Sequence, residues 1–238
     1  MNKVYAVITM DIIGSKKSKE VLNKFLIKNE LINELNYYLN KDDLIDDFLK
    51  KQSIQSSVIL KRKDLILTDI TISRGDELQV VCKNIYEIPY ILRCIRYYLR
   101  PLKIRVGVGI GGINTDLDEE SSWNMNGEAF YNARQALEIL SYDKEAKNKT
   151  HFVTGNCEHD LILNTMYILM DTIMDKWTDA KWNATFLYDE YKKYENAAIK
   201  LGVSPEAVRK SCKRANWSSI ANSEKNIKKY LEIIDYNR

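Results

Sequence analysis

Two aspartates in this sequence stand where strands are expected to end. Asp11 follows the continuous apolar run of residues 4–10, and Asp76 lies in the short polar segment of residues 74–77. Carboxylate oxygens suit Mg²⁺ or Mn²⁺, which keep part of their coordination shell for water and phosphate oxygens. Two such carboxylates side by side would form a divalent-metal site suited to a nucleotide. The alternative is that Asp11 caps a turn and Asp76 is an ordinary hairpin residue.

The spacing of apolar residues predicts the elements that would position these aspartates. Residues 4–10 form a largely apolar run with several β-branched residues, as in a strand buried on both faces. The predicted order is a strand at 4–10, a helix at 19–39, strands at 69–73 and 78–82, a helix at 86–99, a strand at 103–113, a helix at 127–140 and a strand at 151–154. Residues 41–63 are charged and ambiguous, and we interpret them as an insertion.

The first six elements follow the order β-α-β-β-α-β, which is typical of a ferredoxin-like α+β domain. A right-handed crossover makes the first two strands parallel, with the third strand inserted between them. The end of the first strand and the hairpin of residues 74–77 then lie at the same edge of the sheet, so we expect Asp11 and Asp76 to be neighbours. Gly75 supplies the positive φ that this hairpin needs. The strand at 103–113 alternates apolar residues with glycines, so another element should pack very closely against it.

Other polar residues near these strand ends are candidates for contacts with nucleotide phosphates. Lys16 follows Gly14 and Ser15 just before the first predicted helix, where backbone N–H groups favour phosphate. Arg74 and Arg134 have side chains that can donate two hydrogen bonds to one phosphate. The alternative for all three cations is an ordinary solvated charge or surface ion pair.

Residues 194–213 carry the pattern of a helix-turn-helix. Ala198, Gly202 and Val208 have the spacing at which a small residue lets two helices approach, a glycine makes the turn and an apolar residue packs the second helix. Ser204 and Pro205 are residue types that begin such a helix. Its outward edge is basic, and its candidate contacts with duplex DNA are Arg209, Lys210, Lys213 and Arg214. The alternative is a helix-turn-helix used only for packing or dimerisation.

Composition restricts the class of protein. Of the 238 residues, 45% are hydrophobic, and no apolar run reaches the roughly 18 residues that a membrane span needs. The first residues do not resemble a signal peptide and the four cysteines form no paired motif, so we expect a cytoplasmic protein with reduced thiols. Residues 178–238 contain 12 Lys and Arg against 8 Asp and Glu, whereas residues 1–177 contain 24 against 25. Only the C-terminal part is therefore expected to meet a polyanion.

Four short motifs, in their order and spacing, resemble those of the SatD family of bacterial proteins. They are Asp-Ile-x-Gly at residues 11–14, Gly-Asp-Glu-Leu-Gln at residues 75–79, Arg-x-Gly-x-Gly at residues 105–109 and the helix start at residues 126–134. The resemblance covers most of the chain apart from residues 41–63. The helix-turn-helix pattern resembles sigma-factor region 4 and related bacterial regulators.

The first half also resembles the palm of class III nucleotidyl cyclases and GGDEF cyclases. That resemblance implies Mg²⁺ ions held by Asp11, Asp76 and the backbone carbonyl of Ile12 over a nucleotide triphosphate. It also implies that Glu77 stands at the position of the GGDEF glutamate and that the site is completed across a homodimer.

These observations lead to one expected domain organisation and three hypotheses of function. We expect a palm-like nucleotide- and metal-binding domain at residues 1–157, a connecting helix at 158–177 and an all-α helix-turn-helix domain at 178–238. The first hypothesis is a SatD-like regulator that binds a nucleotide in the palm and DNA through the tail. The second is an active nucleotidyl cyclase or oligonucleotide synthetase with a partner-docking tail, although Asn132 and Arg134 lack the four-residue spacing of class III cyclases. The third is a structural interaction protein.

Overall fold

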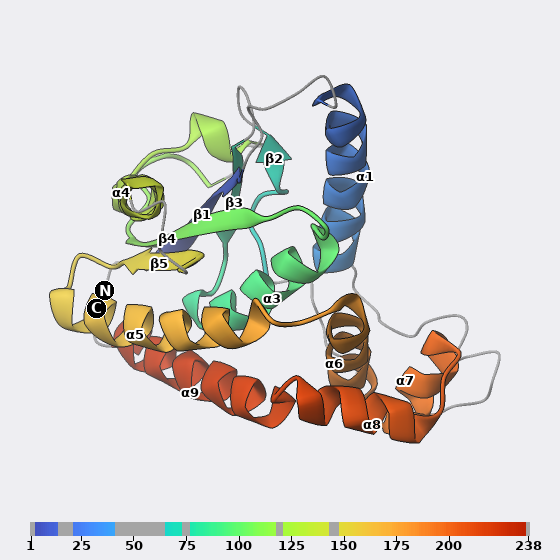
Figure 1. Cartoon of the computed structure of the whole chain (residues 1–238). Helices are drawn as coiled ribbons and strands as arrows, with labels where there is room; N and C mark the ends of the chain where they lie inside the picture. The colour runs from blue at the N-terminus through green and yellow to red at the C-terminus, as the bar shows by residue number, and fades with distance from the viewer. Residues whose placement is uncertain are drawn as a thin grey trace.

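The computed structural model of the chain describes residues 3–13, 21–40, 65–72, 77–117, 121–142 and 148–236, arranged as in Figure 1. Five strands in these ranges form one sheet in the order β2-β3-β1-β4-β5. The strands are β1 (Tyr5–Ile12), β2 (Thr71–Ile72), β3 (Leu78–Cys82), β4 (Ile104–Gly111) and β5 (Thr150–Val153). β1 is antiparallel to β3 and β4, β2 is antiparallel to β3, and β5 is parallel to β4. The expected adjacency of the first and third strands is confirmed.

Strand β1 continues beyond the apolar run that predicted it. Asp11 pairs with Arg105, and Ile12 pairs with Ile104, in the antiparallel ladder with β4. Asp11 therefore lies within the strand and not after its end. Residues 41–63 and most of the hairpin that carries Asp76 lie outside the described residues.

Helices lie on both faces of the sheet. They are α1 (Val21–Asn40), η1 (Ile85–Glu87), α3 (Ile88–Tyr98), η2 (Ser122–Asn124), α4 (Glu128–Tyr142), α5 (Cys157–Met174), α6 (Asp179–Tyr191), α7 (Tyr194–Leu201), α8 (Pro205–Arg214) and α9 (Trp217–Tyr236). The side chains of β1 alternate between the faces: Ile8 and Met10 join the main core with α1 and α3, whereas Val7 packs with Ala129 and Ala133 of α4. None of these helices is long and apolar enough to cross a membrane.

Glycines on β4 let helix α4 pack against the sheet, backbone to backbone. A Cβ atom at Gly109 would lie 2.1 Å from both the carbonyl oxygen of Ala129 and the amide nitrogen of Ala133. A Cβ atom at Gly107 would lie 2.5 Å from the carbonyl oxygen of Ala133 and the amide nitrogen of Leu137. No side chain fits at these separations, because protein interiors are already close-packed. The close packing expected against residues 103–113 is confirmed.

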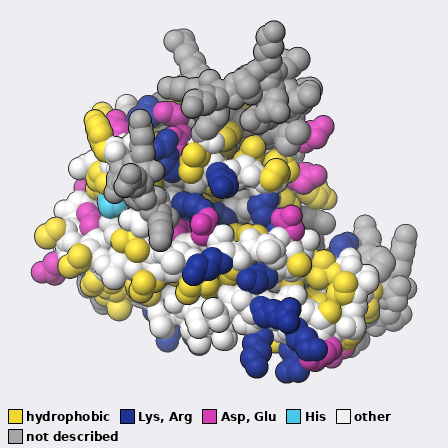
Figure 2. Space-filling model, in the orientation of Figure 1, with side chains coloured by type: hydrophobic (Ala, Val, Ile, Leu, Met, Phe, Trp, Pro, Cys, Tyr) yellow, Lys and Arg dark blue, Asp and Glu magenta, His cyan; other side chains and the backbone are white. Residues whose placement is uncertain are grey.

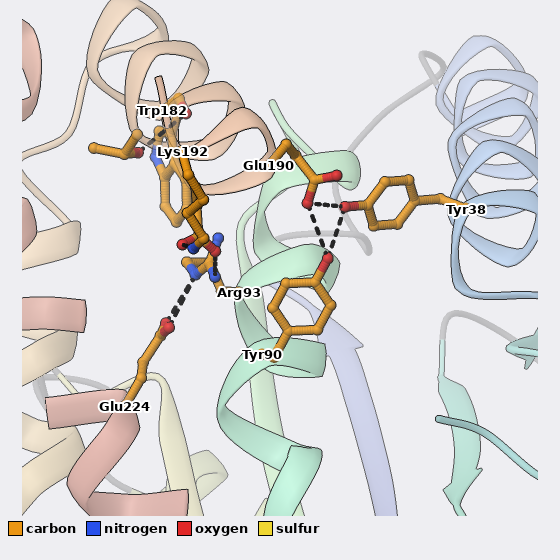
Figure 3. Close-up of polar contacts among 9 residues, drawn as sticks. Tyr38, Tyr90, Arg93, Trp182, Glu190, Lys192 and Glu224 are labelled. Atoms are coloured by element: carbon orange, nitrogen blue, oxygen red, sulfur yellow. Dashed lines mark hydrogen bonds and ion pairs between the residues drawn. The ribbon is translucent and has the colours of Figure 1, made fainter. Parts of the chain in front are cut away.

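Helix α3 joins the sheet to the C-terminal helices through a buried ionic cluster, which Figure 3 shows. Arg93 of α3, whose side chain is 3% exposed, forms ion pairs with Asp189 of α6 at 2.5 Å and with Glu224 of α9 at 2.9 Å. Its guanidinium also lies 4.9 Å from the ring centre of Trp217 at the start of α9. One cation therefore holds three helices that are far apart in the sequence.

A second polar contact in Figure 3 adds helix α1 to this junction. Glu190 of α6 accepts hydrogen bonds from the hydroxyls of Tyr38 in α1, at 2.6 Å, and Tyr90 in α3, at 3.1 Å. Around these contacts, one hydrophobic core runs from the sheet into the C-terminal helices as far as Val208 and Ile234. Helices α7 and α8 are thus packed onto the sheet and its helices through a shared core.

Candidate functional site

A row of polar side chains lies on the face of the sheet toward α4. We call it the polar row, and its members are Thr9, Asp11, Glu77, Gln79 and Arg105. They share this face because side chains alternate along a strand, and Ile8 and Met10 point into the core on the other side. The register of β1 with β3 pairs Met10 with Leu78, and one further pair aligns Asp11 with Glu77.

Asp11 and Arg105 form a two-pronged ion pair at the centre of the polar row. Arg105 donates from Nε to Oδ1 of Asp11 at 2.9 Å and from Nη2 to Oδ2 at 2.5 Å. Their side chains are 18% and 24% exposed, so the pair is partly shielded from solvent. The charge of Asp11 is balanced here by an arginine that the sequence analysis did not include among the site residues.

Two buried polar atoms, one of them in the polar row, have no hydrogen-bond partner within the part of the chain that the structure describes. Gln79 is 6% exposed and donates to Thr9 Oγ1 at 3.2 Å, but its own oxygen, Oε1, accepts no hydrogen bond within the part of the chain that the structure describes. The indole N–H of Trp123, in η2, is likewise without an acceptor there. Buried polar groups are almost always satisfied, so one free acceptor and one free donor are candidate contacts for a ligand.

Helix α4 places one charged side chain against the polar row. Arg134 donates to Glu77 at 2.7 Å, and the two side chains are 51% and 29% exposed. Asn132, two residues earlier, donates instead to the backbone oxygen of Ile110 on β4 at 2.9 Å. The two side chains therefore have different roles, and Asn132 helps to hold α4 on the sheet.

The predicted metal and nucleotide residues are only partly within the described ranges. Asp11, Ile12, Glu77 and Arg134 lie there, and the structure brings Asp11, Glu77 and Arg134 to the same face. The others lie outside the described residues: Gly14, Ser15, Lys16, Arg74, Gly75 and Asp76. Among described residues, no three His, Cys, Asp or Glu side chains gather in a way that could hold a metal ion. The expected closeness of Asp11 and Asp76 stays a prediction.

Helices α7 and α8 and their connection have the local structure that the sequence predicts. Gly202 ends α7 with a positive φ of 66°. Ser204 caps α8 by accepting a hydrogen bond from the backbone N–H of Ala207 at 3.2 Å, and Pro205 is the first residue of α8. Val208 is 1% exposed, because it packs α8 onto the core.

The outward face of α8 is basic. Its exposed cations are Arg209, Lys210, Lys213 and Arg214, and Figure 2 shows Lys and Arg side chains gathered over this helix. Glu206 pairs with Arg209 through two hydrogen bonds, at 2.8 and 2.9 Å, and lies 3.8 Å from Lys210. Lys213 and Arg214 form no ion pair with any described residue. They are therefore the cations most available to a phosphate.

Sequence reasoning missed four residues around the candidate site: Thr9, Gln79, Arg105 and Trp123. For the first three, the alternation of side chains along each predicted strand was an available signal, since Thr9 and Asp11 must share a face. The pairing of Arg105 with Asp11 also required knowing that β1 and β4 are neighbours. Trp123 lies in a short 3₁₀ helix for which the sequence offered no comparable pattern.

Comparisons with known proteins identify a family for this chain. The model described as "SatD family (SatD)" matches residues 5–226. No curated protein matches the chain. Among solved structures, the chain is similar to "Crystal Structure of Regulator of Polyketide Synthase Expression from Bifidobacterium adolescentis", with 11% identity over 95% of this chain and 86% of that chain and a TM-score of 0.25. A likeness this low supports no conclusion about fold or function.

Proposed function

The chain belongs to the SatD family, and we propose that it is a regulator that binds duplex DNA through α7 and α8. One observation carries this proposal: α8 buries Val208 and exposes Arg209, Lys210, Lys213 and Arg214 to solvent. A helix-turn-helix reads DNA with its second helix in the major groove, and cations along that helix contact phosphates. Residues 178–238 carry a net charge of only +4, and one such module would bind DNA weakly. We therefore propose that the protein binds DNA as a homodimer. We also propose that it acts in the cytoplasm.

The salt dependence of DNA binding tests this proposal. Each phosphate contact releases condensed counterions, so the affinity should fall steeply with salt. Replacing Lys213 and Arg214 with alanine in the full chain should reduce the slope of log affinity against log salt by about two, one for each lost contact. The measurement is fluorescence anisotropy with a labelled mixed-sequence duplex at about 50 to 200 mM salt.

A matched control removes the same charge elsewhere. The double variant Lys225→Ala/Lys229→Ala changes two exposed cations of α9 and should keep the wild-type slope. Equal slopes in wild type and in the α8 variant would show that this face does not bind DNA. The helix-turn-helix would then serve packing or partner docking.

We also propose that the polar row binds a nucleotide together with Mg²⁺ or Mn²⁺. The order β2-β3-β1-β4, with antiparallel neighbours, supports a ferredoxin-like palm. Asp11, Asp76 and the carbonyl of Ile12 would hold the metal, and the free oxygen of Gln79 on the same face suits such a cation. The proposed nucleotide contacts are Gly14, Ser15, Lys16, Arg74, Gly75, Glu77 and Arg134.

Arg105 is a further candidate contact for the nucleotide phosphates in this second proposal. A guanidinium that grips a carboxylate with two hydrogen bonds matches a phosphate equally well. A cation on Asp11 would balance the charge that Arg105 balances now, and Arg105 would then be available to the nucleotide phosphates. Asn132 donates its hydrogen bond to the backbone of β4 and not toward the polar row, and this favours nucleotide binding over the reaction of an active cyclase.

Thermal stability tests the nucleotide site. Mn²⁺ with a non-hydrolysable ATP or GTP analogue should raise the Tm by about 5 °C or more at saturation, because a ligand that binds only the folded state stabilises it. Asp76→Asn should remove most of the shift, whereas Asp235→Asn on α9 should keep it. An equal shift in wild type and Asp76→Asn would place the cation elsewhere, and pyrophosphate release from ATP or GTP would favour the cyclase hypothesis.

A further inference from the structure

A small cavity lies where the sheet meets the C-terminal helices, on the face away from the polar row. Its volume is about 180 Å³, and its lining residues come from the end of α3, the α3–β4 connection and the first residue of β4, the residue before β5, the end of α5 and the start of α6. Pockets for drug-sized ligands begin at about 300 Å³. The cavity therefore fits a ligand smaller than a nucleotide.

Two arginines that line this cavity have buried N–H groups without acceptors. Arg96 is 9% exposed and pairs with the fully buried Asp171 at 2.8 Å, but its Nε has no hydrogen-bond partner among the described residues. Nη1 of Arg100 is also without a hydrogen bond there, although it lies 3.4 Å from Asp179. An unsatisfied buried donor costs about 1–3 kcal/mol, so an acceptor supplied by a ligand would be stabilising.

Two lysines add positive charge to the same lining. Lys103 forms no ion pair within the ranges that the structure describes. Lys149 pairs with Asp175, and burial, followed by the charge of Arg96, lowers its pKa below the ordinary value. Lys103 is therefore a cation that no described carboxylate balances, whereas burial disfavours the charged form of Lys149 despite its pairing with Asp175. An anion in the cavity would interact favourably with each of them.

The N-terminus of α6 also borders the cavity and favours negative charge. α6 has 13 residues, and its N-cap residue, Thr178, accepts no hydrogen bond through its side chain. The unpaired N–H groups of such a first turn, with the helix dipole, attract anions. Asp179 is 88% exposed and lies 3.4 Å from Arg100. Its exposed carboxylate lies at the edge of the cavity, where an external anion would compete with it for Arg100.

We propose that this cavity binds a small oxyanion, the phosphate or carboxylate group of a metabolite smaller than a nucleotide. Arg96 and Arg100 supply unsatisfied donors, Lys103 and Lys149 supply charge, and the first turn of α6 supplies backbone N–H groups. Trp177 and Trp182, whose ring centres are 4.7 Å apart, form an apolar wall for the rest of the ligand. This site is separate from the polar row and does not depend on the function proposed for it.

Tryptophan fluorescence of the full chain tests the proposal, because two of the four tryptophans line the cavity. Inorganic phosphate and acetate are titrated separately at constant ionic strength, with chloride as the balancing ion. We expect a saturable change with at least one oxyanion, and the more effective one assigns the phosphate or the carboxylate group. No saturable change with either, or the same change with chloride alone, would overturn the proposal.

Variants of two exposed residues should change the affinity for the oxyanion in opposite directions. Lys103→Gln should weaken binding about tenfold, the usual contribution of a hydrogen bond to a charged group. Asp179→Asn should tighten binding several-fold, because it removes the competing carboxylate. Lys229→Gln on α9 and Asp76→Asn at the proposed nucleotide site should leave the affinity unchanged. Weaker binding in Asp179→Asn, or equal weakening in Lys229→Gln, would contradict the assignment.

Discussion

Gly109→Ala is expected to lower the free energy of unfolding by about 3 kcal/mol or more, the upper part of the range for overpacking a core. The added methyl group would lie 2.1 Å from two backbone atoms of α4, at Ala129 and Ala133. Neither backbone atom can move away by a rotamer change, as a side-chain atom can, so the added methyl group has to displace the helix from the sheet. Urea denaturation followed by circular dichroism measures the loss.

A nearby glycine on the same chain segment provides the matched control. A Cβ atom at Gly112 would have no heavy atom within 4 Å. Gly112→Ala should therefore change stability by no more than about 1 kcal/mol, and the smaller freedom of the unfolded chain favours a gain. Equal losses in Gly109→Ala and Gly112→Ala would show that this segment of the chain is sensitive to any added side chain and not specifically to the contact with α4.

Arg93→Met should be the most destabilising change at the junction of the sheet and the C-terminal helices. It leaves Asp189 and Glu224 without their shared cation, and their side chains are only 16% and 12% exposed. Removing one partner of a buried ion pair costs about 3–5 kcal/mol, because the remaining charge stays buried. Chemical denaturation of the full chain, with probes in the sheet and in the helices, measures this loss.

The double variant Arg93→Met/Glu224→Met separates charge from packing. Replacing a buried ionic group with apolar residues of similar size is often neutral, whereas breaking it is not. We expect the double variant to recover a large part of the stability that Arg93→Met loses. If the double variant is less stable than the single one, the losses come from packing against Trp217 and not from an unbalanced charge.

The sequence predicted most elements because their patterns are local. Each of three patterns predicted its structure from neighbouring residues alone. The apolar run of residues 4–10 predicted a strand, the glycines of residues 103–113 predicted close packing, and residues 202–205 predicted the turn between two helices. The extent of β1 was underestimated, because Asp11 and Ile12 join the strand only through their pairing with Arg105 and Ile104. Such pairing joins residues more than 90 positions apart, and local spacing does not encode it.

The candidate sites were less predictable than the elements. Asp11 is a polar residue after an apolar run, so it was found, but its ion pair with Arg105 depends on the order of the strands. The cavity beside α6 combines residues of five separate segments, and no motif connects Arg96 with Lys149 or Trp182. The Arg93 cluster joins three helices in the same way. These features follow from the packing of elements, which periodicity alone does not fix.

The glycine contacts between β4 and α4 also limit how the polar row can change its width. Backbone atoms of α4 lie directly over Gly107 and Gly109, and Arg105 Nη1 donates to the backbone oxygen of Leu140 in α4 at 3.4 Å, so α4 is fixed against β4 at three successive positions on this face of the strand. Strand and helix therefore move as one rigid body. The backbone positions of Arg105 on β4 and Arg134 on α4 then keep a constant separation, whatever is bound between the two side chains. Any closing of the row around a ligand has to come from β3, the strand at which Glu77 and Gln79 lie.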